Sequence, residues 1–278
     1  HTIQTCGHQI NFVITNNGKW SDDDFDRFEF VSDYKVNGLN NHYHTYGLGV
    51  PLIAVRKIRE LETLEDQYYP TGLTFPVTAF FRALDMKKLP RPGEKSAHSC
   101  VLELHDPVSN TDVRLSDRLA PLESDTSTPL AYLLNDPLLI TQTLATFALL
   151  NAEFGKDYEG LYMLEPFDPN KIPVLLVHGL WSSPTTWMDM FNDLQAMKEL
   201  RDNYQFWFYL YPTGQPFWIT AAQMRQDLDH ARQVLDPERR LAALDHAVLV
   251  GHSMGGLISR LQTLDSRDDY WKLVSDRS

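Results

Sequence analysis

The chain has little cysteine and no long apolar run. Only Cys6 and Cys100 occur among its 278 residues, and their wide separation excludes a disulfide framework or a cysteine-rich metal site. No stretch approaches the roughly 18 apolar residues that a transmembrane helix needs, so we expect no such helix. A starting methionine and a basic-then-apolar leader are also missing. The compartment therefore stays open between a soluble cytoplasmic protein and an exported one whose signal segment is missing.

Basic residues are also scarce relative to acidic ones. There are 25 Lys and Arg residues against 37 Asp and Glu residues, a formal net charge of −12. Most of the excess negative charge lies in the first 165 residues. Such a chain is repelled by the phosphates of nucleic acid and by anionic lipid, so we expect neither as a partner. The sequence gives no indication of the oligomeric state.

The N-terminal part reads as β structure followed by helix. Apolar runs separated by turn residues predict a β-rich, sandwich-like domain over residues 1–125 and a helical connector over 126–165. The expected strands are 75–84, 100–105 and 112–115, with a turn at 106–110 between the last two and a further strand at 162–164 that enters the next sheet.

Residues 166–278 alternate between apolar runs and amphipathic segments, as an α/β fold requires. Near-continuous apolar strands are typical of a parallel sheet that is covered on both faces. We therefore expect a parallel sheet with flanking helices. The expected strands are 172–178, 204–211 and 247–250, and the expected helices begin at Ser183-Pro184, run over 216–235, and follow the last strand to about residue 264.

The hexapeptide Gly251-His252-Ser253-Met254-Gly255-Gly256 directly follows the last of these strands. A Gly-x-Ser-x-Gly motif between a strand and a helix predicts a nucleophile elbow, with Ser253 at the apex of a strained turn. Glycine is needed on both sides because side chains there would collide as strand and helix fold back on each other. The hydroxyl would then lie at the N-terminus of a helix, where negative charge is favoured.

A second motif, His178-Gly179-Leu180-Trp181, ends the strand that begins at Ile172. With both motifs in this order, the chain resembles the α/β-hydrolase superfamily, in particular its lipase and esterase branch. The resemblance implies an oxyanion hole made by the backbone N–H groups of Leu180 and Met254, with Ser253 as nucleophile. The residues that would support this elbow and loop are Gly251, His252, Gly255, Gly256, His178 and Gly179.

The resemblance implies hydrolysis of a carboxylic ester, from a small molecule or a lipid, without a metal or organic cofactor. The pair of motifs is also similar to that of GPI inositol-deacylase-like lipases and of acyltransferases. An acyltransferase, a serine peptidase on the same fold, and a non-catalytic binding protein with a degenerate hydrolase core stay open as alternatives.

The superfamily needs an Asp or Glu and then a His after the nucleophile, and residues 254–278 hold no histidine. We therefore expect residues 166–278 to be the N-terminal half of a hydrolase domain, with the acid and base beyond residue 278. This chain alone is then expected to be inactive. Neither His178 nor His252 is expected to replace the missing base.

Two further patterns concern binding. An aromatic loop follows the second strand, at the sheet edge where open α/β sheets bind ligands. It suggests an apolar substrate pocket lined by Trp181, Tyr211, Phe217 and Trp218.

The pair His42 and His44 has the spacing of metal ligands, but no cysteine or carboxylate stands nearby at ligand spacing. The sequence therefore favours an ordinary loop there and no metal site.

Overall fold

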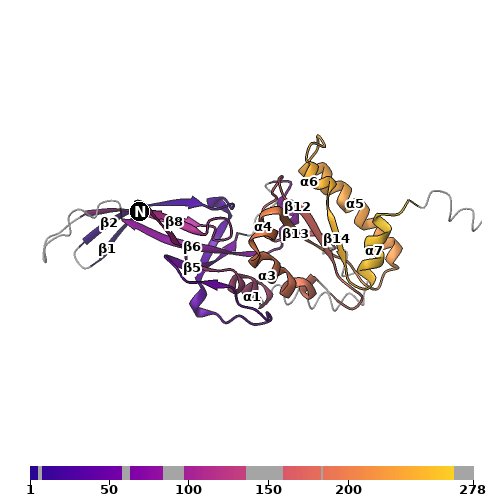
Figure 1. The fold of residues 1–278 in the computed structure, drawn as a ribbon, viewed down its shortest axis with the longest axis horizontal. Coiled ribbons are helices and arrows are strands. Elements are labelled where there is room, and N and C mark those ends of the chain that lie inside the picture. The colour runs from indigo at the N-terminus through magenta and orange to yellow at the C-terminus, as the bar shows by residue number, and fades with distance from the viewer. Residues whose placement is uncertain (6–7, 58–62, 84–96, 136–158, 183, 266–278) are drawn as a thin grey trace, which may run out of the picture. The chain divides into compact units, whose positions relative to one another are not determined.

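A computed structural model describes residues 1–5, 8–57, 63–83, 97–135, 159–182 and 184–265 (Figure 1). The chain divides into two compact units. Unit 1 comprises His1–Ile140, Leu164–Pro166 and Met188–Arg201, and unit 2 comprises Thr141–Met163, Phe167–Trp187 and Asp202–Ser278. Most of the expected connector, residues 136–158, lies outside the described residues.

Unit 1 is built on a six-stranded sheet with the order β1-β2-β7-β6-β5-β3. Neighbouring strands are antiparallel, except that β2 and β7 run parallel. The strands are β1 Thr2–Thr5, β2 His8–Asn17, β3 Phe25–Phe30, β5 Val50–Arg56, β6 Thr74–Ala83 and β7 Ala97–His105.

The second layer of unit 1 differs from the sandwich that the sequence suggested. The unit is β-rich, but its other two sheets among the described residues have two strands each, β4 with β10 and β8 with β9. Helix α1 and strand β10 both contact β5 and β6, where a sandwich would have a large second sheet. The remaining elements are η1 Asp22–Asp24, η2 Val31–Asp33, β4 His44–Thr45, η3 Asp66–Tyr68, β8 Asp112–Leu115, β9 Arg118–Pro121, β10 Ser124–Asp125, α1 Ser127–Asn135, α3 Met188–Ala196 and α4 Lys198–Asn203, whose last two residues belong to unit 2.

Aromatic rings and one buried ion pair form a packed cluster in unit 1. The ring of Trp20 stacks on that of Phe75 at 4.7 Å and meets Tyr69 edge-on at 5.2 Å. The guanidinium of Arg56 lies 4.6 Å from the centre of the Tyr69 ring and forms a buried ion pair with Asp66. Because the charges are desolvated, each partner depends on the other to stay buried.

Unit 2 contains a four-stranded sheet with the order β11-β13-β12-β14. Strand β12 runs parallel to both of its neighbours, and β11 adds to the edge antiparallel to β13. The three expected strands and the additional one are confirmed to within one or two residues. The elements are β11 Gly160–Met163, β12 Ile172–Val177, η5 Pro184–Trp187, β13 Tyr204–Leu210, α5 Phe217–Leu235, α6 Ala242–Asp245, β14 Val248–Gly251 and α7 Met254–Gln262.

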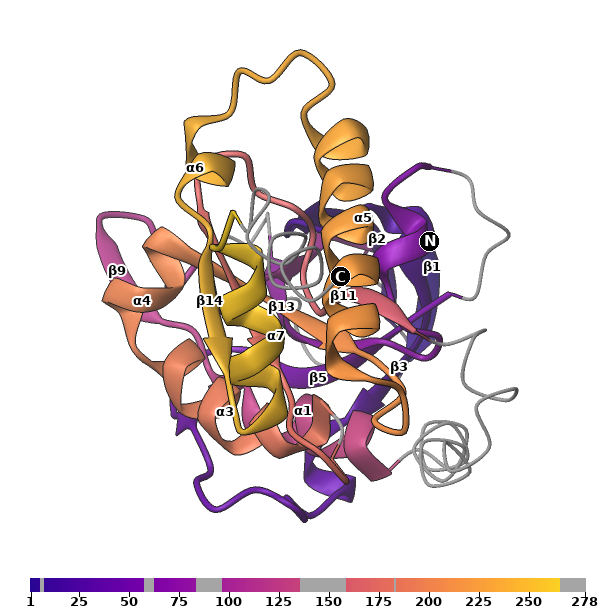
Figure 2. The same ribbon diagram turned by 90° about the vertical axis from the view of Figure 1, so that its right-hand side faces the viewer.

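Helices α5 and α7 lie side by side over the sheet of unit 2 (Figure 2). Helix α7 contacts β12 and β14, and α5 contacts β11. The segment expected as one helix after Ser183-Pro184 is instead a 3-10 turn, η5, followed by α3, and Ser183 itself is outside the described residues. Across the described ranges, no helix has both the length and the apolar character needed to cross a membrane.

Candidate active site

Both sequence motifs leave the sheet of unit 2 at the same edge. Strands β12 and β14 are parallel neighbours, and Val177 pairs with Gly251 at their carboxyl ends. The N–H of His252 donates to the carbonyl of Val177 at 3.0 Å, which extends the pairing by one residue. The His178 loop and the Ser253 turn therefore start side by side, at the edge where open α/β sheets bind ligands.

Ser253 occupies a strained position at the apex of its turn. Its backbone has φ 53° and ψ −120°, a sparsely populated region that costs roughly 1–3 kcal/mol for a residue with a side chain. The carbonyls of His252 and Ser253 accept hydrogen bonds of 2.9 Å from the N–H groups of Gly255 and Gly256, which close the turn into α7. The side chain of Ser253 is exposed. The strained apex predicted from the motif is therefore present.

Three glycines make the close approach of these segments sterically feasible. A Cβ on Gly251 would collide with the carbonyl group of Gly255. One on Gly255 would lie 2.5 Å from the carbonyl oxygen of His178 and still closer to that of Val177. A Cβ on Gly179 would lie 3.1 Å from the Cβ of Ser253. The two motifs thus touch backbone to backbone, which only glycine permits at these separations.

His178 is a buried, neutral support for its loop. Its side chain is fully buried, and its ring stacks on that of Tyr211 with centroids 4.2 Å apart. The hydroxyl of Tyr211 donates to the backbone carbonyl of His178 at 2.6 Å. Burial lowers the pKa of His178 to about 4, so the imidazole is uncharged near neutral pH. These contacts fix the backbone immediately before Gly179.

The N-terminus of α7 favours negative charge next to Ser253. Met254 is the first residue of α7, and the N–H of a first helical residue has no acceptor within its own helix. The helix dipole adds a partial positive charge at the same end. Leu180 directly follows Gly179, and its side chain is 48% exposed. Their joint role as oxyanion donors stays a prediction.

The four aromatic residues suggested for a substrate pocket differ in their surroundings. Tyr211 is buried and supports the His178 loop through the contacts given above. Trp181 and Trp218 are 71% and 59% exposed, and Trp181 has a positive φ of 58°. Phe217 is half-buried and meets Trp218 edge-on at 5.2 Å. Tyr211 is therefore part of the framework, and the other three are accessible to a ligand.

Within the described residues, no imidazole or carboxylate is hydrogen-bonded to the hydroxyl of Ser253. His178 is buried, as stated, and His252 is exposed with its Nδ1 against Gly179. His246 precedes β14 and so lies at the opposite end of that strand from Ser253. His230 lies within α5. A base and an acid for Ser253 are not identified among these side chains.

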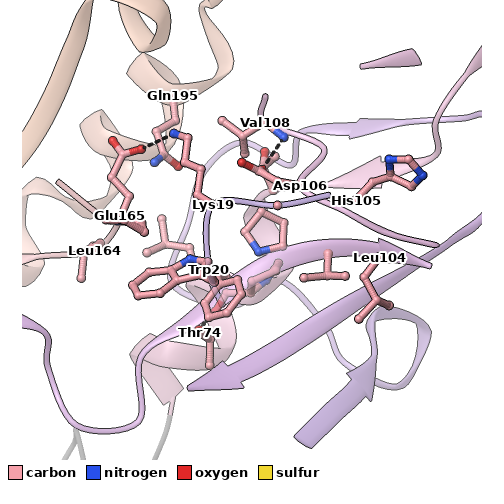
Figure 3. A pocket seen from close by; sticks show the side chains of 18 of the residues that line it. Lys19, Trp20, Thr74, Leu104, His105, Asp106, Val108, Leu164, Glu165 and Gln195 are labelled. Carbon is pink, nitrogen blue, oxygen red and sulfur yellow. Dashed lines mark hydrogen bonds and ion pairs between the residues drawn. The ribbon is translucent and has the colours of Figure 1, made fainter. Parts of the chain in front are cut away.

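Unit 1 contains a pocket that the sequence did not indicate (Figure 3). Its apolar lining includes Trp20, Phe75 and Leu130. Figure 3 shows Lys19 and Glu165 joined across one side, at a nitrogen–oxygen distance of 3.2 Å. The lining comes from separate chain segments, so no local pattern could have revealed it.

The described residues also bring together a group of side chains that could hold a metal ion. His42, His44 and Asp125 each offer one ligand atom, and these atoms lie within 4.8 Å of one another. Sequence reasoning found the two histidines and missed the carboxylate, which lies 83 residues after His42.

One comparison with known proteins matches the C-terminal part of the chain. Residues 174–274 match the model of a family described as the alpha/beta hydrolase family. The matched stretch contains the ends of β12 and β14 and the whole Ser253 turn, and it supports a hydrolase-type fold there. No curated protein and no solved structure matches the chain.

Proposed function

We propose that the protein is a serine hydrolase that cleaves carboxylic esters through an acyl-enzyme on Ser253. The observation that carries this proposal is the strained, exposed Ser253 at the N-terminus of α7, packed against Gly179 of the neighbouring strand end. A structural turn has no need for such strain, whereas a nucleophile benefits because its hydroxyl is held clear of the backbone. The family match of residues 174–274 supports the same class of chemistry.

The proposed reaction has two steps. The Oγ of Ser253 attacks the ester carbonyl carbon while its proton passes to a general base, and the carbonyl oxygen becomes an oxyanion. The backbone N–H groups of Leu180 and Met254 hold this oxyanion, each worth about 3–4 kcal/mol by analogy with other oxyanion holes. The C–O bond then breaks, and the alcohol leaves with the proton from the base. Water, activated by the same base, releases the acid and restores Ser253.

The reaction also needs a general base and an acid that orients it. The resemblance to the superfamily puts an acidic residue and then a histidine after the nucleophile. The histidines of unit 2 fit the base poorly, since His178 is buried and held neutral, and His246 lies at the wrong end of β14. The proposal therefore rests on Ser253 and the two backbone donors, and it assigns no described side chain as base or acid.

The substrate class is inferred from exposed apolar side chains that follow the strand ends at the same sheet edge as the Ser253 turn. Leu180 and Trp181 follow the end of β12, and Trp218 follows the end of β13, all at the carboxyl edge of the sheet and all substantially exposed. Apolar side chains around a few backbone donors are typical of sites that bind acyl or alcohol groups. We therefore assign a small-molecule or lipid ester as the substrate.

Labelling with a fluorophosphonate tests the nucleophile in the full-length protein. We expect a covalent adduct on Ser253 that is lost in Ser253→Ala and kept in Ser182→Ala, a serine of the same sheet edge outside the turn. A folded protein that resists labelling, or that still labels in Ser253→Ala, contradicts the proposal.

Substrate panels then separate the related activities. Faster turnover of p-nitrophenyl esters than of peptide anilides supports the esterase assignment, and the reverse order identifies a serine peptidase. Preferential transfer of the acyl group to an added alcohol, rather than to water, identifies an acyltransferase.

A further inference from the structure

We propose that unit 1 contains a binding site for a divalent transition-metal ion, with chemistry suited to Zn²⁺, formed by His42, His44 and Asp125. The site is independent of the Ser253 chemistry. Two imidazoles and one carboxylate are ligands that zinc uses in proteins, usually with water in the remaining position. Strand pairing, hydrogen bonds and burial hold these three side chains in place.

The short β4–β10 ribbon sets the positions of the ligands. His44 and Asp125 are directly paired in the antiparallel register, so their side chains lie on the same face. The backbone of Tyr43 is held on both sides, because its N–H donates to the Ser127 hydroxyl at 2.8 Å and its carbonyl accepts from the N–H of Thr126 at 3.2 Å. This anchor fixes the chain between the two histidines.

Asp125 is a rigid, buried carboxylate. Its side chain has no exposed surface, and its Oδ1 accepts a hydrogen bond of 2.7 Å from the N–H of Thr128 at the start of α1. Its Oδ2 accepts from the Thr128 hydroxyl at 2.7 Å and also lies 2.6 Å from the Nε2 of His42. Burying a carboxylate is costly unless cations or donors surround it. The arrangement leaves Oδ2 directed at both imidazoles.

The orientation of His44 matches that of a metal ligand. Its Nε2 lies 3.2 Å from Oε1 of Glu123, while its Nδ1 lies 3.7 Å from Oδ2 of Asp125. Metal-bound histidines commonly donate their other ring N–H to a carboxylate, which fixes the tautomer. Here a proton on Nε2 leaves the lone pair of Nδ1 directed toward Asp125. Glu123 is therefore assigned as the positioning residue of the site.

The distances are close to those that a bound ion requires. Zinc–ligand bonds of about 2.0–2.1 Å in a tetrahedron separate neighbouring ligand atoms by roughly 3.3 Å. The two observed separations from Asp125 Oδ2 are 2.6 Å to His42 and 3.7 Å to His44, on either side of that value. The side chain of His42 is 48% exposed, so its ring has room to move and the ion has a route in.

Metal binding at this site is also coupled to the release of protons. The ion replaces the direct contact between His42 and Asp125, and it requires both ligating nitrogens to be unprotonated. Any proton that His42 shares with Asp125 is released to water as the ion binds. Three protein ligands would leave one position of a tetrahedral ion for a water molecule.

Titration of the EDTA-treated, desalted protein with Zn²⁺ tests the proposal. Calorimetry is expected to show one bound equivalent, and the melting temperature is expected to rise with Zn²⁺ concentration because the ion binds only the folded state. Combined replacement His42→Ala and His44→Ala should abolish both effects. Glu123→Gln should weaken binding about 10- to 100-fold, as expected for a partner that orients a ligand.

The controls keep the result decisive. His246→Ala removes an exposed histidine of unit 2 and should bind Zn²⁺ as the unmodified protein does. Asp125 variants are avoided because that side chain also caps α1. No binding by a protein that circular dichroism shows to be folded would overturn the proposal. Equal binding by the double histidine variant would do the same, since the ion would then bind elsewhere.

Discussion

Gly255 and Gly256 are neighbours in the same helix turn, yet alanine at the two positions should have opposite effects. At Gly255 a Cβ would lie 2.5 Å from the carbonyl oxygen of His178 and closer still to that of Val177. Ordinary carbon contacts need about 3.5 Å, so α7 would have to move away from β12 by roughly 1 Å. At Gly256 the nearest atom, the Gly251 oxygen, is 3.4 Å away, which is an ordinary contact.

The expected magnitudes follow from these distances. Overpacking against backbone costs about 3 kcal/mol at the upper end of its range, so Gly255→Ala should destabilise by about that amount. Gly256→Ala should instead stabilise by about 0.5–1 kcal/mol, because alanine is the better helix former. In urea, a loss of about 3 kcal/mol lowers the unfolding midpoint by about 1–3 M at typical slopes. Equal midpoints for the two variants, or a lower one for Gly256→Ala, would refute the packing argument.

Three other substitutions probe the surroundings of the site and the core of unit 1. Burial holds the pKa of His178 near 4, below its ordinary 6.5, so between these values the unfolded chain binds a proton that the native state does not. The contribution of His178 to the free energy of unfolding is then fully present above about pH 6.5 and falls by about 3 kcal/mol as the pH drops towards 4. Urea titrations at several pH values should show this dependence on pH, and His178→Gln should lose it. Tyr211→Phe leaves the buried carbonyl of His178 without its donor and should cost about 1–3 kcal/mol in the same assay, with a null effect counting against the contact. Arg56→Met removes the guanidinium from the buried carboxylate of Asp66 and should destabilise unit 1 by about 3–5 kcal/mol. The double variant that also replaces Asp66 with Leu should not show this loss, because no buried charge is then left without its counter-charge.

The strands and the Ser253 turn of unit 2 were predicted well because neighbouring residues in the sequence determine each of them. Strands β12, β13 and β14 are apolar runs bounded by turn residues, and the motif around Ser253 implies a strained turn through its glycines alone. The bounds of α5 were predicted to within one residue for the same reason, since one apolar face repeats along 19 residues.

Features that depend on distant residues were not predicted. Strands β2 and β7 pair in parallel although three other strands of the same sheet lie between them in the sequence. No local periodicity indicates such a distant partner. Asp125 reaches His42 across 83 residues for the same reason. Tyr211 was expected to line a pocket because aromatic composition does not distinguish an open ring from one stacked on His178.

Trapping the acyl-enzyme tests the central claim most directly. The full-length protein is mixed with a p-nitrophenyl ester, the reaction is stopped with acid within the first turnover, and the digested protein is analysed by mass spectrometry. We expect a burst of p-nitrophenol and an added acyl mass on the peptide that contains Ser253, both absent in Ser253→Ala. Ester turnover that leaves Ser253 unmodified, or that persists in Ser253→Ala, would contradict it.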